Sequence, residues 1–137
     1  MFKKIVVGGT FEGLHAGHKL VLKTAFDNGG SVVVGLTSDE FATRFRSRRV
    51  TSYEQRKRRL ISFLKRFRKP YDIVEISDSY GVATLSRAID AIVVSEETML
   101  RAEEINTIRF KKGLPKIVMI VVPLVLGKGG RPLSSGG

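Results

Sequence analysis

Two histidines, His15 and His18, stand three positions apart and are the only histidines in the chain. An apolar run and the glycine pair Gly8–Gly9 precede them, and apolar residues at helical spacing follow them. This order predicts a strand, a tight turn and the start of a helix. Imidazole has an ordinary pKa close to neutrality, so both side chains can donate hydrogen bonds there.

A helix start of this kind is suited to anions. The first amide groups of a helix lack partners within it, and its dipole makes that end partly positive. Gly8 and Gly9 would let the backbone approach a ligand closely. With two imidazoles added, these groups suit a phosphate whose charge grows during a reaction. The alternatives are a plain turn with surface histidines and a metal site, which the lack of cysteine and of a third histidine disfavours.

The composition is that of one compact domain over residues 1–137, with 42% hydrophobic and 27% charged residues. The chain shows no apolar run long enough to span a bilayer and no signal-peptide pattern, so we expect a cytoplasmic protein. A formal net charge of +11 favours anionic partners, either nucleotides or nucleic acid.

The elements that must position the histidines alternate along the chain. The predicted strands cover residues 3–8, 31–36, 71–76, 91–95 and 117–122. The predicted helices cover residues 17–28, a short segment after Thr37, a segment from Ser52 to Lys69, and residues 82–89 and 95–112. This alternation predicts an α/β fold, a Rossmann-like doubly wound sheet of about five parallel strands with helices on both faces.

In such a sheet ligands bind at the carboxyl ends of the strands, where the strand order reverses. The turn with His15 and His18 follows the first strand, a loop beginning at Thr37 follows the second, and Ser95 ends the fourth. We therefore expect these three segments to lie close together.

The spacing from Gly9-Thr10-Phe11 to His15-x-Gly17-His18 resembles the (H/T)xGH signature of the nucleotidyltransferase superfamily. The resemblance implies that the turn follows the first strand of a Rossmann-like fold. It also implies that the glycines and Thr10 shape the turn while the histidines hold nucleotide phosphates.

Further segments resemble the archaeal type of phosphopantetheine adenylyltransferase over nearly the whole chain. They are Gly35–Phe41, Tyr53-Glu54-x-Arg56, Val94–Thr98, Ile105-Asn106-x-x-Arg109 and Gly130-x-Pro132–Ser135. This resemblance implies adenylyl transfer from ATP to 4′-phosphopantetheine with Mg²⁺, giving dephospho-coenzyme A and pyrophosphate. A cytidylyltransferase, or an adenylyltransferase with another phosphate acceptor, is the nearest alternative, because glycerol-phosphate cytidylyltransferases share part of these motifs.

The resemblance also implies roles for individual residues. His18 would hold the α-phosphate, His15 the outer phosphates, and Thr10 would lie close to the reacting phosphates. Arg46 and Arg48 are candidates for the acceptor phosphate, since guanidinium groups bind phosphate in a bidentate manner. The remaining residues expected at the nucleotide are Gly8, Gly9, Phe11, Gly17, Ser95, Glu96, Arg109, Ser134 and Ser135.

Structural alternatives exist for several of these residues. Ser95 could be a plain helix cap, and Arg109 could simply offset neighbouring acidic residues. The basic run from Arg56 to Arg59 is expected to form a solvated helix face.

The tail departs from the family pattern. There, Ser-Ser-Thr, a basic residue and a helix usually follow, whereas Gly136 and Gly137 follow Ser135 here. We expect a C-terminal clamp helix to be missing and full activity to be in doubt. A basic nucleic-acid-binding module is the competing function, although no named nucleic-acid motif or interleaved aromatic pattern supports it.

Overall fold

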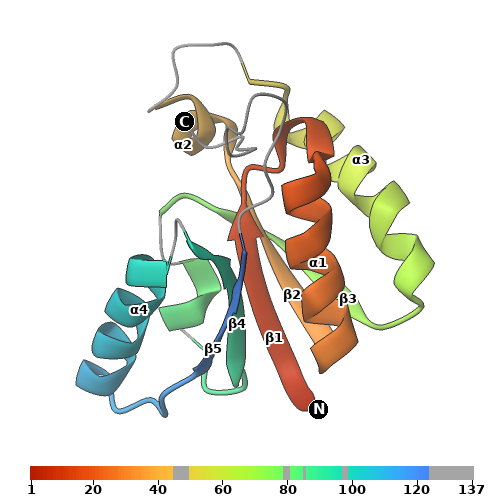
Figure 1. The fold of residues 1–137 in the computed structure, drawn as a ribbon. Helices are drawn as coiled ribbons and strands as arrows, with labels where there is room; N and C mark the ends of the chain where they lie inside the picture. Colours follow the sequence, from red (N-terminus) through yellow and green to blue (C-terminus); the bar gives the residue numbers. More distant parts are fainter. Residues whose placement is uncertain (45–49, 79–80, 85, 97–98, 124–137) are drawn as a thin grey trace.

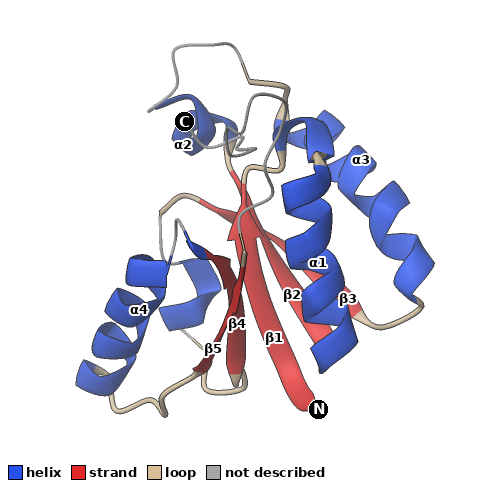
Figure 2. Cartoon of the chain, viewed as in Figure 1, coloured by secondary structure: helices blue, strands red, loops and turns tan. Residues whose placement is uncertain are grey.

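The structure is a computed structural model that describes residues 1–44, 50–78, 81–84, 86–96 and 99–123. Within these residues five parallel strands form one sheet (Figure 1, Figure 2). They are β1 (Phe2–Gly9), β2 (Gly29–Thr37), β3 (Tyr71–Ile76), β4 (Ala91–Ser95) and β5 (Val118–Val122). The predicted parallel sheet is confirmed, although β2 begins two residues earlier than expected and ends one residue later, at Thr37.

The strand order is β3-β2-β1-β4-β5, so the chain moves outward from β1 to β3 and then returns to the other side of β1. The reversal lies between β1 and β4, which pair in parallel through Ile5–Ala91 and Val6–Ile92. The carboxyl ends of β1 and β4 therefore flank the position at which ligands bind in sheets of this type.

Helices cover both faces of the sheet (Figure 2). On one face α1 (Ala16–Asn28) and α3 (Tyr53–Leu64), which continues as the 3₁₀ turn η2 (Lys65–Phe67), cover a core that includes Ile5 and Val7. On the other face α4 (Met99–Lys111) covers a core that includes Val6. Successive residues of β1 thus feed opposite cores, as the pleat of a strand requires. No helix in the described part of the chain is long and apolar enough to cross a membrane.

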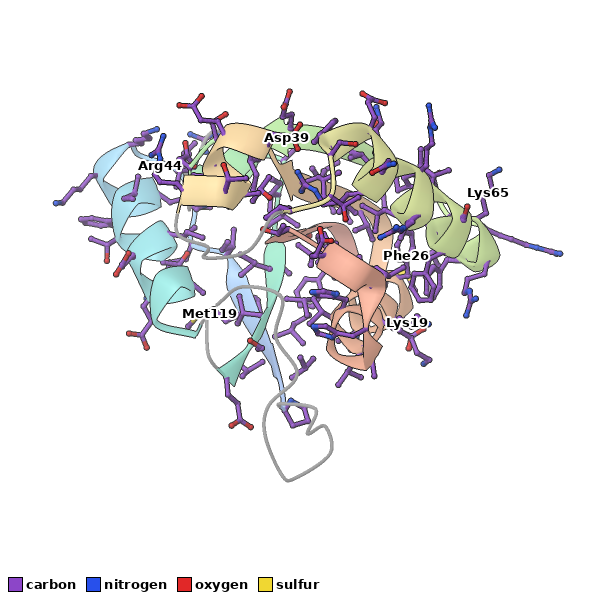
Figure 3. All side chains as sticks on the ribbon, turned by 90° about the horizontal axis from the view of Figure 1, so that it is seen from above. Lys19, Phe26, Asp39, Arg44, Lys65 and Met119 are labelled. Atoms are coloured by element: carbon purple, nitrogen blue, oxygen red, sulfur yellow. The ribbon has the colours of Figure 1, made fainter. Side chains whose placement is uncertain are left out.

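An aromatic layer joins α1 to α3. The ring of Phe26 stacks on Phe67 at a centroid distance of 4.5 Å, and Phe63 meets Phe67 edge to face at 5.4 Å. Viewed from above, Phe26 lies between the two helices, while α4 stands apart on the other side of the sheet (Figure 3). This layer packs the last turn of α3 and the 3₁₀ turn η2 against the last turns of α1.

The predicted helix over residues 82–89 is wrong. Among the described residues of this stretch, only a 3₁₀ turn, η3 (Gly81–Thr84), forms before β4. The side chain of Arg109 takes the place of helical hydrogen bonds here, because its Nη1 donates to the carbonyls of Ala83 at 2.7 Å and Ser86 at 2.8 Å.

Arg109 is fully buried and lies near the amino-terminal ends of β4 and β5. Its Nη2 reaches the carbonyl of Ile89 at 3.4 Å, and its Nε donates to that of Pro115 at 2.8 Å. Burial lowers the pKa of Arg109, and the nearby charge of Arg87 lowers it further. Arg109 therefore fastens the connection before β4 and the connection before β5 to α4.

We predict that Arg109→Met lowers the free energy of unfolding by roughly 2–4 kcal/mol, since each buried carbonyl left without a donor costs about 1–3 kcal/mol. Urea unfolding followed by circular dichroism measures the loss. Lys111→Met, an exposed change on the same helix, is the matched control and should have little effect. Unchanged stability of Arg109→Met together with weakened ATP binding would return Arg109 to the nucleotide site.

Candidate active site

The chain leaves β1 through a turn of unusual backbone geometry. Phe11, Gly13 and Leu14 all have left-handed φ angles, of 52°, 72° and 42°, around the 3₁₀ turn η1 (Glu12–Leu14). Glycine adopts such angles freely, but for Phe11 and Leu14 they are strained. Strain of this kind persists where the surrounding structure holds it in place, which is common at binding and catalytic sites.

Phe11 holds the turn against the first helix. It is 3% exposed, and its ring meets the His18 ring edge to face at a centroid distance of 5.3 Å. By contrast, a Cβ added at the exposed Gly8 would find only ordinary contacts, with Ile76 at 3.7 Å and the Gly35 carbonyl at 3.8 Å. Packing within the chain therefore explains Phe11 but does not require glycine at position 8, whereas close approach of a ligand would.

The two histidines cap the first helix reciprocally. The amide of Gly17 donates to His15 Nδ1 at 3.1 Å, and the amide of His15 donates to His18 Nδ1 at 3.2 Å. The helix begins at Ala16, one residue earlier than predicted, and the imidazole rings stack at 3.7 Å. Because each Nδ1 accepts a hydrogen bond, each neutral ring carries its proton on Nε2 and presents a donor there.

The Nε2 atom of His15 is buried and has no hydrogen-bond partner in the described part of the chain. Burial also lowers the pKa of His15 below its ordinary value of 6.5. Protonation of His15 would destroy the acceptor that Gly17 uses and would place a charge against the stacked ring of His18. His15 is therefore a neutral imidazole near pH 7 with an N–H donor to offer.

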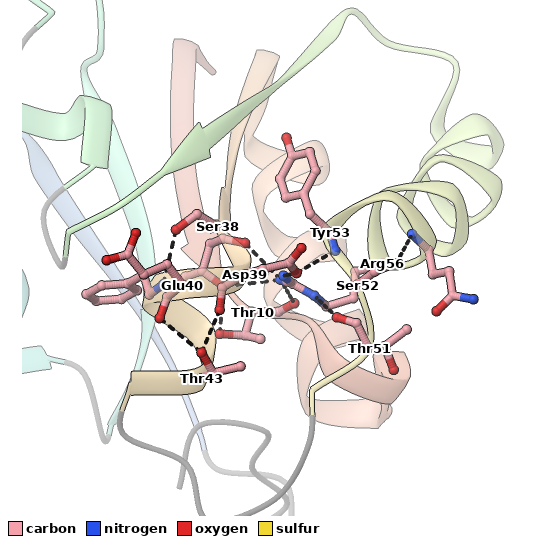
Figure 4. A network of polar contacts seen from close by, with 12 residues as sticks. Thr10, Ser38, Asp39, Glu40, Thr43, Thr51, Ser52, Tyr53 and Arg56 are labelled. Atoms are coloured by element: carbon pink, nitrogen blue, oxygen red, sulfur yellow. Dashed lines mark hydrogen bonds and ion pairs between the residues drawn. The ribbon is translucent and has the colours of Figure 1, made fainter.

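A buried arginine ties the turn to two other segments at the same edge (Figure 4). Arg56 is fully buried and lies in the first turn of α3. Its Nη1 donates to the carbonyls of Thr10 at 3.2 Å and Thr37 at 2.9 Å, and its Nε donates to that of Thr51 at 2.8 Å. Its Nη2 pairs with Asp39 at 3.0 Å. One guanidinium thus joins the ends of β1 and β2 to the starts of α2 (Asp39–Arg44) and α3.

The expectation of a solvated helix face is wrong for Arg56, although Arg58 and Arg59 are exposed as predicted. A signal for this was present in the sequence. Arg56 stands four residues before Leu60, and therefore on the apolar stripe of its helix.

Two carboxylates hold the carboxyl-terminal end of the basic loop, the segment 44–51 that carries Arg46 and Arg48, and the residues that follow it. Glu12 accepts the amide of Thr51 at 3.1 Å and also its hydroxyl, while Asp39 accepts the amide of Tyr53 at 2.7 Å. The loop's own candidates for the acceptor phosphate, Arg46 and Arg48, lie outside the described residues. So do Ser134 and Ser135.

The other predicted residues divide into two groups. Gly8, Gly9, Thr10, Phe11, His15, Gly17 and His18 gather in the turn between β1 and α1. Ser95 ends β4, the strand beside β1, and the exposed Glu96 follows it. Arg109 is not part of either group. It lies at the opposite end of the sheet, where β4 and β5 begin, and its N–H groups donate to backbone carbonyls there. This placement contradicts the expectation that Arg109 contacts the nucleotide.

The site also contains Thr37, which the sequence placed at the start of a loop expected nearby but not among the site residues. Thr37 is 4% exposed, and its hydroxyl donates to that of Thr10 at 2.9 Å. Its position at the end of a strand was the only available signal. Among the described residues no group of three or more His, Asp or Glu side chains could hold a metal ion.

Known proteins are similar to this chain in sequence and in fold. The family model described as Cytidylyltransferase-like matches residues 6–135. A phosphopantetheine adenylyltransferase from Pyrococcus abyssi is 43% identical over 98% of this chain and 87% of its own length. The chain belongs to the phosphopantetheine adenylyltransferase family. The predicted membership is confirmed, and with it the expectation of a nucleotidyltransferase.

Other relatives agree with this family assignment. A phosphopantetheine adenylyltransferase from Methanopyrus kandleri is 41% identical, with 98% of this chain and 87% of the relative covered. A crystal structure of a protein with unknown function from Archaeoglobus fulgidus has a TM-score of 0.79 at 36% identity, covering 87% of this chain and 88% of that one. A pantoate-beta-alanine ligase from Francisella tularensis shares the fold alone, with a TM-score of 0.65 at 15% identity, over 98% of this chain and 64% of its own.

The lowered pKa of His15 predicts how the stability of this adenylyltransferase-family domain depends on pH. Below pH 6.5 the unfolded chain binds more protons at His15 than the folded chain does. The contribution of the neutral cap is therefore complete above about pH 6.5 and is lost as the pH falls through the folded-state pKa.

The measurement is urea unfolding between pH 5 and 8 for the unaltered chain and for His15→Asn, which keeps a capping side chain but does not titrate. We expect the difference between the two proteins to grow in favour of His15→Asn as the pH falls below about 6.5. Since the chain has two histidines, NMR titration of the imidazole protons gives the pKa directly. A pKa of His15 above 6.5 would contradict the prediction.

Proposed function

We propose that this chain transfers the adenylyl group of ATP to the phosphate of 4′-phosphopantetheine, releasing pyrophosphate and forming dephospho-coenzyme A. The observation that supports it best is the reciprocal histidine cap at the start of α1. Both Nδ1 atoms accept backbone amides, and Nε2 of His15 is buried without a hydrogen-bond partner among the described residues. Membership of the family indicates which two substrates to expect. Because the proposed reaction consumes ATP, we expect the protein to act in the cytoplasm.

In this reaction an oxygen of the acceptor phosphate attacks the α-phosphorus of ATP, and the bond from that phosphorus to the pyrophosphate oxygen breaks. A phosphate monoester is already anionic near pH 7, so no general base is needed. The protein has to align the two phosphates and stabilise the charge that spreads over the transferred group. Neutral imidazole donors at a helix start suit this role.

The residues divide the task. We assign the α-phosphate in the transition state to His18 and the outer phosphates to His15. Thr10, at the start of the strained turn, lies close to the reacting phosphates. Arg46 and Arg48 stay candidates for the acceptor phosphate, and Ser95 and Glu96, at the end of β4, for the nucleotide.

Mg²⁺ is expected to enter with ATP. The metal would neutralise part of the charge on the outer phosphates, and it usually binds through phosphates and water with few protein ligands. The described residues fit this arrangement, since the buried Nε2 of His15 has no hydrogen-bond partner among them and would donate to a phosphate oxygen that the metal does not bind.

A pyrophosphate-release assay tests the function. ATP and CTP are each paired with 4′-phosphopantetheine, glycerol 3-phosphate and nicotinamide mononucleotide as acceptors, with Mg²⁺ present. We expect release only with ATP and 4′-phosphopantetheine. Release with CTP or with another acceptor would favour the alternative transferases. Tight, salt-dependent nucleic-acid binding without any release would instead favour the basic binding module.

We predict that His18→Ala lowers kcat far more than it raises KM. Loss of one donor to a developing charge costs about 10²–10³ in kcat, or roughly 3–4 kcal/mol. Steady-state kinetics with saturating 4′-phosphopantetheine gives both constants. Lys23→Ala, a change on the exposed side of the same helix, is the control. A raised KM at unchanged kcat would limit His18 to ground-state binding.

A further inference from the structure

The hydroxyl of Thr10 is the last member of a hydrogen-bond chain that begins at Arg56. Nη1 of Arg56 lies 3.2 Å from Thr37 Oγ1, and Thr37 Oγ1 lies 2.9 Å from Thr10 Oγ1. Figure 4 shows Arg56 and Thr10 in this network. Arg56 is fully buried and Thr37 is 4% exposed, whereas Thr10 is partly exposed at the end of β1. This series of hydrogen bonds therefore runs from the protein interior to the turn that carries the histidines.

The chemistry of arginine determines which group donates and which accepts in each of these hydrogen bonds. A guanidinium only donates hydrogen bonds, so the Thr37 oxygen must accept from it. The hydrogen of Thr37 then goes to Thr10 Oγ1, because leaving a buried hydroxyl without a partner costs about 1–3 kcal/mol. Since Thr10 Oγ1 accepts from Thr37, the hydrogen of Thr10 itself remains to be donated.

Arg56 also fixes the backbone on which this hydroxyl stands. The same Nη1 donates to the Thr10 carbonyl at 3.2 Å and to the Thr37 carbonyl at 2.9 Å. The two strand ends are thus held at one atom, directly before the strained Phe11. A cationic donor at the start of a hydrogen-bond chain polarises the bonds that follow.

We propose that Arg56 and Thr37 are positioning residues that orient the Thr10 hydroxyl as a hydrogen-bond donor to an oxygen of the phosphorylated acceptor. This inference rests on the proposed function and deepens it. Thr37 acts only through Thr10. Loss of its hydroxyl should therefore lower the affinity for ligands that carry a phosphate and leave the affinity for the acceptor without its phosphate unchanged.

The test is a double-mutant cycle of Thr10→Val and Thr37→Val, with Thr37→Ser as the conservative variant. Valine keeps the shape of threonine, and the Arg56 bonds to the two carbonyls remain, so the fold should persist; thermal unfolding checks this. Thr24→Val, which removes a hydroxyl bonded to the Leu20 carbonyl in α1, is the matched control. Calorimetry gives the affinities for 4′-phosphopantetheine, for pantetheine without phosphate, and for inorganic phosphate.

We expect Thr37→Val to weaken binding of 4′-phosphopantetheine about tenfold, the size of one modest hydrogen bond to a charged group. Pantetheine affinity should not change, and Thr37→Ser should bind like the unaltered chain. In the Thr10→Val background, Thr37→Val should have no further effect, since the residue it acts through is gone.

Equal losses for pantetheine and 4′-phosphopantetheine, or losses that add in the double variant, would overturn the positioning role. Failure of the proposed function gives a different pattern. In that case the unaltered chain neither binds 4′-phosphopantetheine nor releases pyrophosphate, and inorganic phosphate then reports on Thr10. A non-additive loss of phosphate affinity still supports the positioning role of Thr37, and unchanged phosphate affinity in all variants overturns it.

Discussion

The burial of Arg56 is the constraint on which the site depends. A guanidinium without water must have its hydrogen bonds satisfied by the protein, or burial would cost several kcal/mol. Here three carbonyls and Asp39 satisfy it, and those carbonyls belong to the ends of β1 and β2 and to the entry of α3. The same bonds that stabilise the charge therefore also hold the three segments together.

The histidine pair shows how one side chain can serve structure and chemistry at once. Each Nδ1 accepts a backbone amide, which secures the helix start and sets the tautomer. Each Nε2 is then a donor with a fixed direction. The lowered pKa of His15 follows from burial of the same ring, so the neutral form that caps the helix is also the form suited to donate to phosphate.

A second buried arginine provides a comparison at the other edge of the sheet. Arg109 donates to four carbonyls in the connections before β4 and β5, where no expected site residue other than itself lies. Asn106, one turn earlier, accepts the amide of Ile117 and donates to its carbonyl. The motif formed by these two residues therefore stabilises the fold, while Arg56 stabilises the fold and shapes the site.

The sequence alone determined the alternation of strands and helices, the turn with His15 and His18, and the family. Each of these depends on residues close together in the chain, whose spacing sets local hydrogen bonds and apolar periodicity. Only the tertiary structure decided what the long basic side chains do. Arg56 meets Thr10 across 46 positions, and Arg109 meets Ala83 across 26, where it replaces the helix that local propensity favoured. Such partners are set by the strand order and by the packing of helices on the sheet, which no local spacing records.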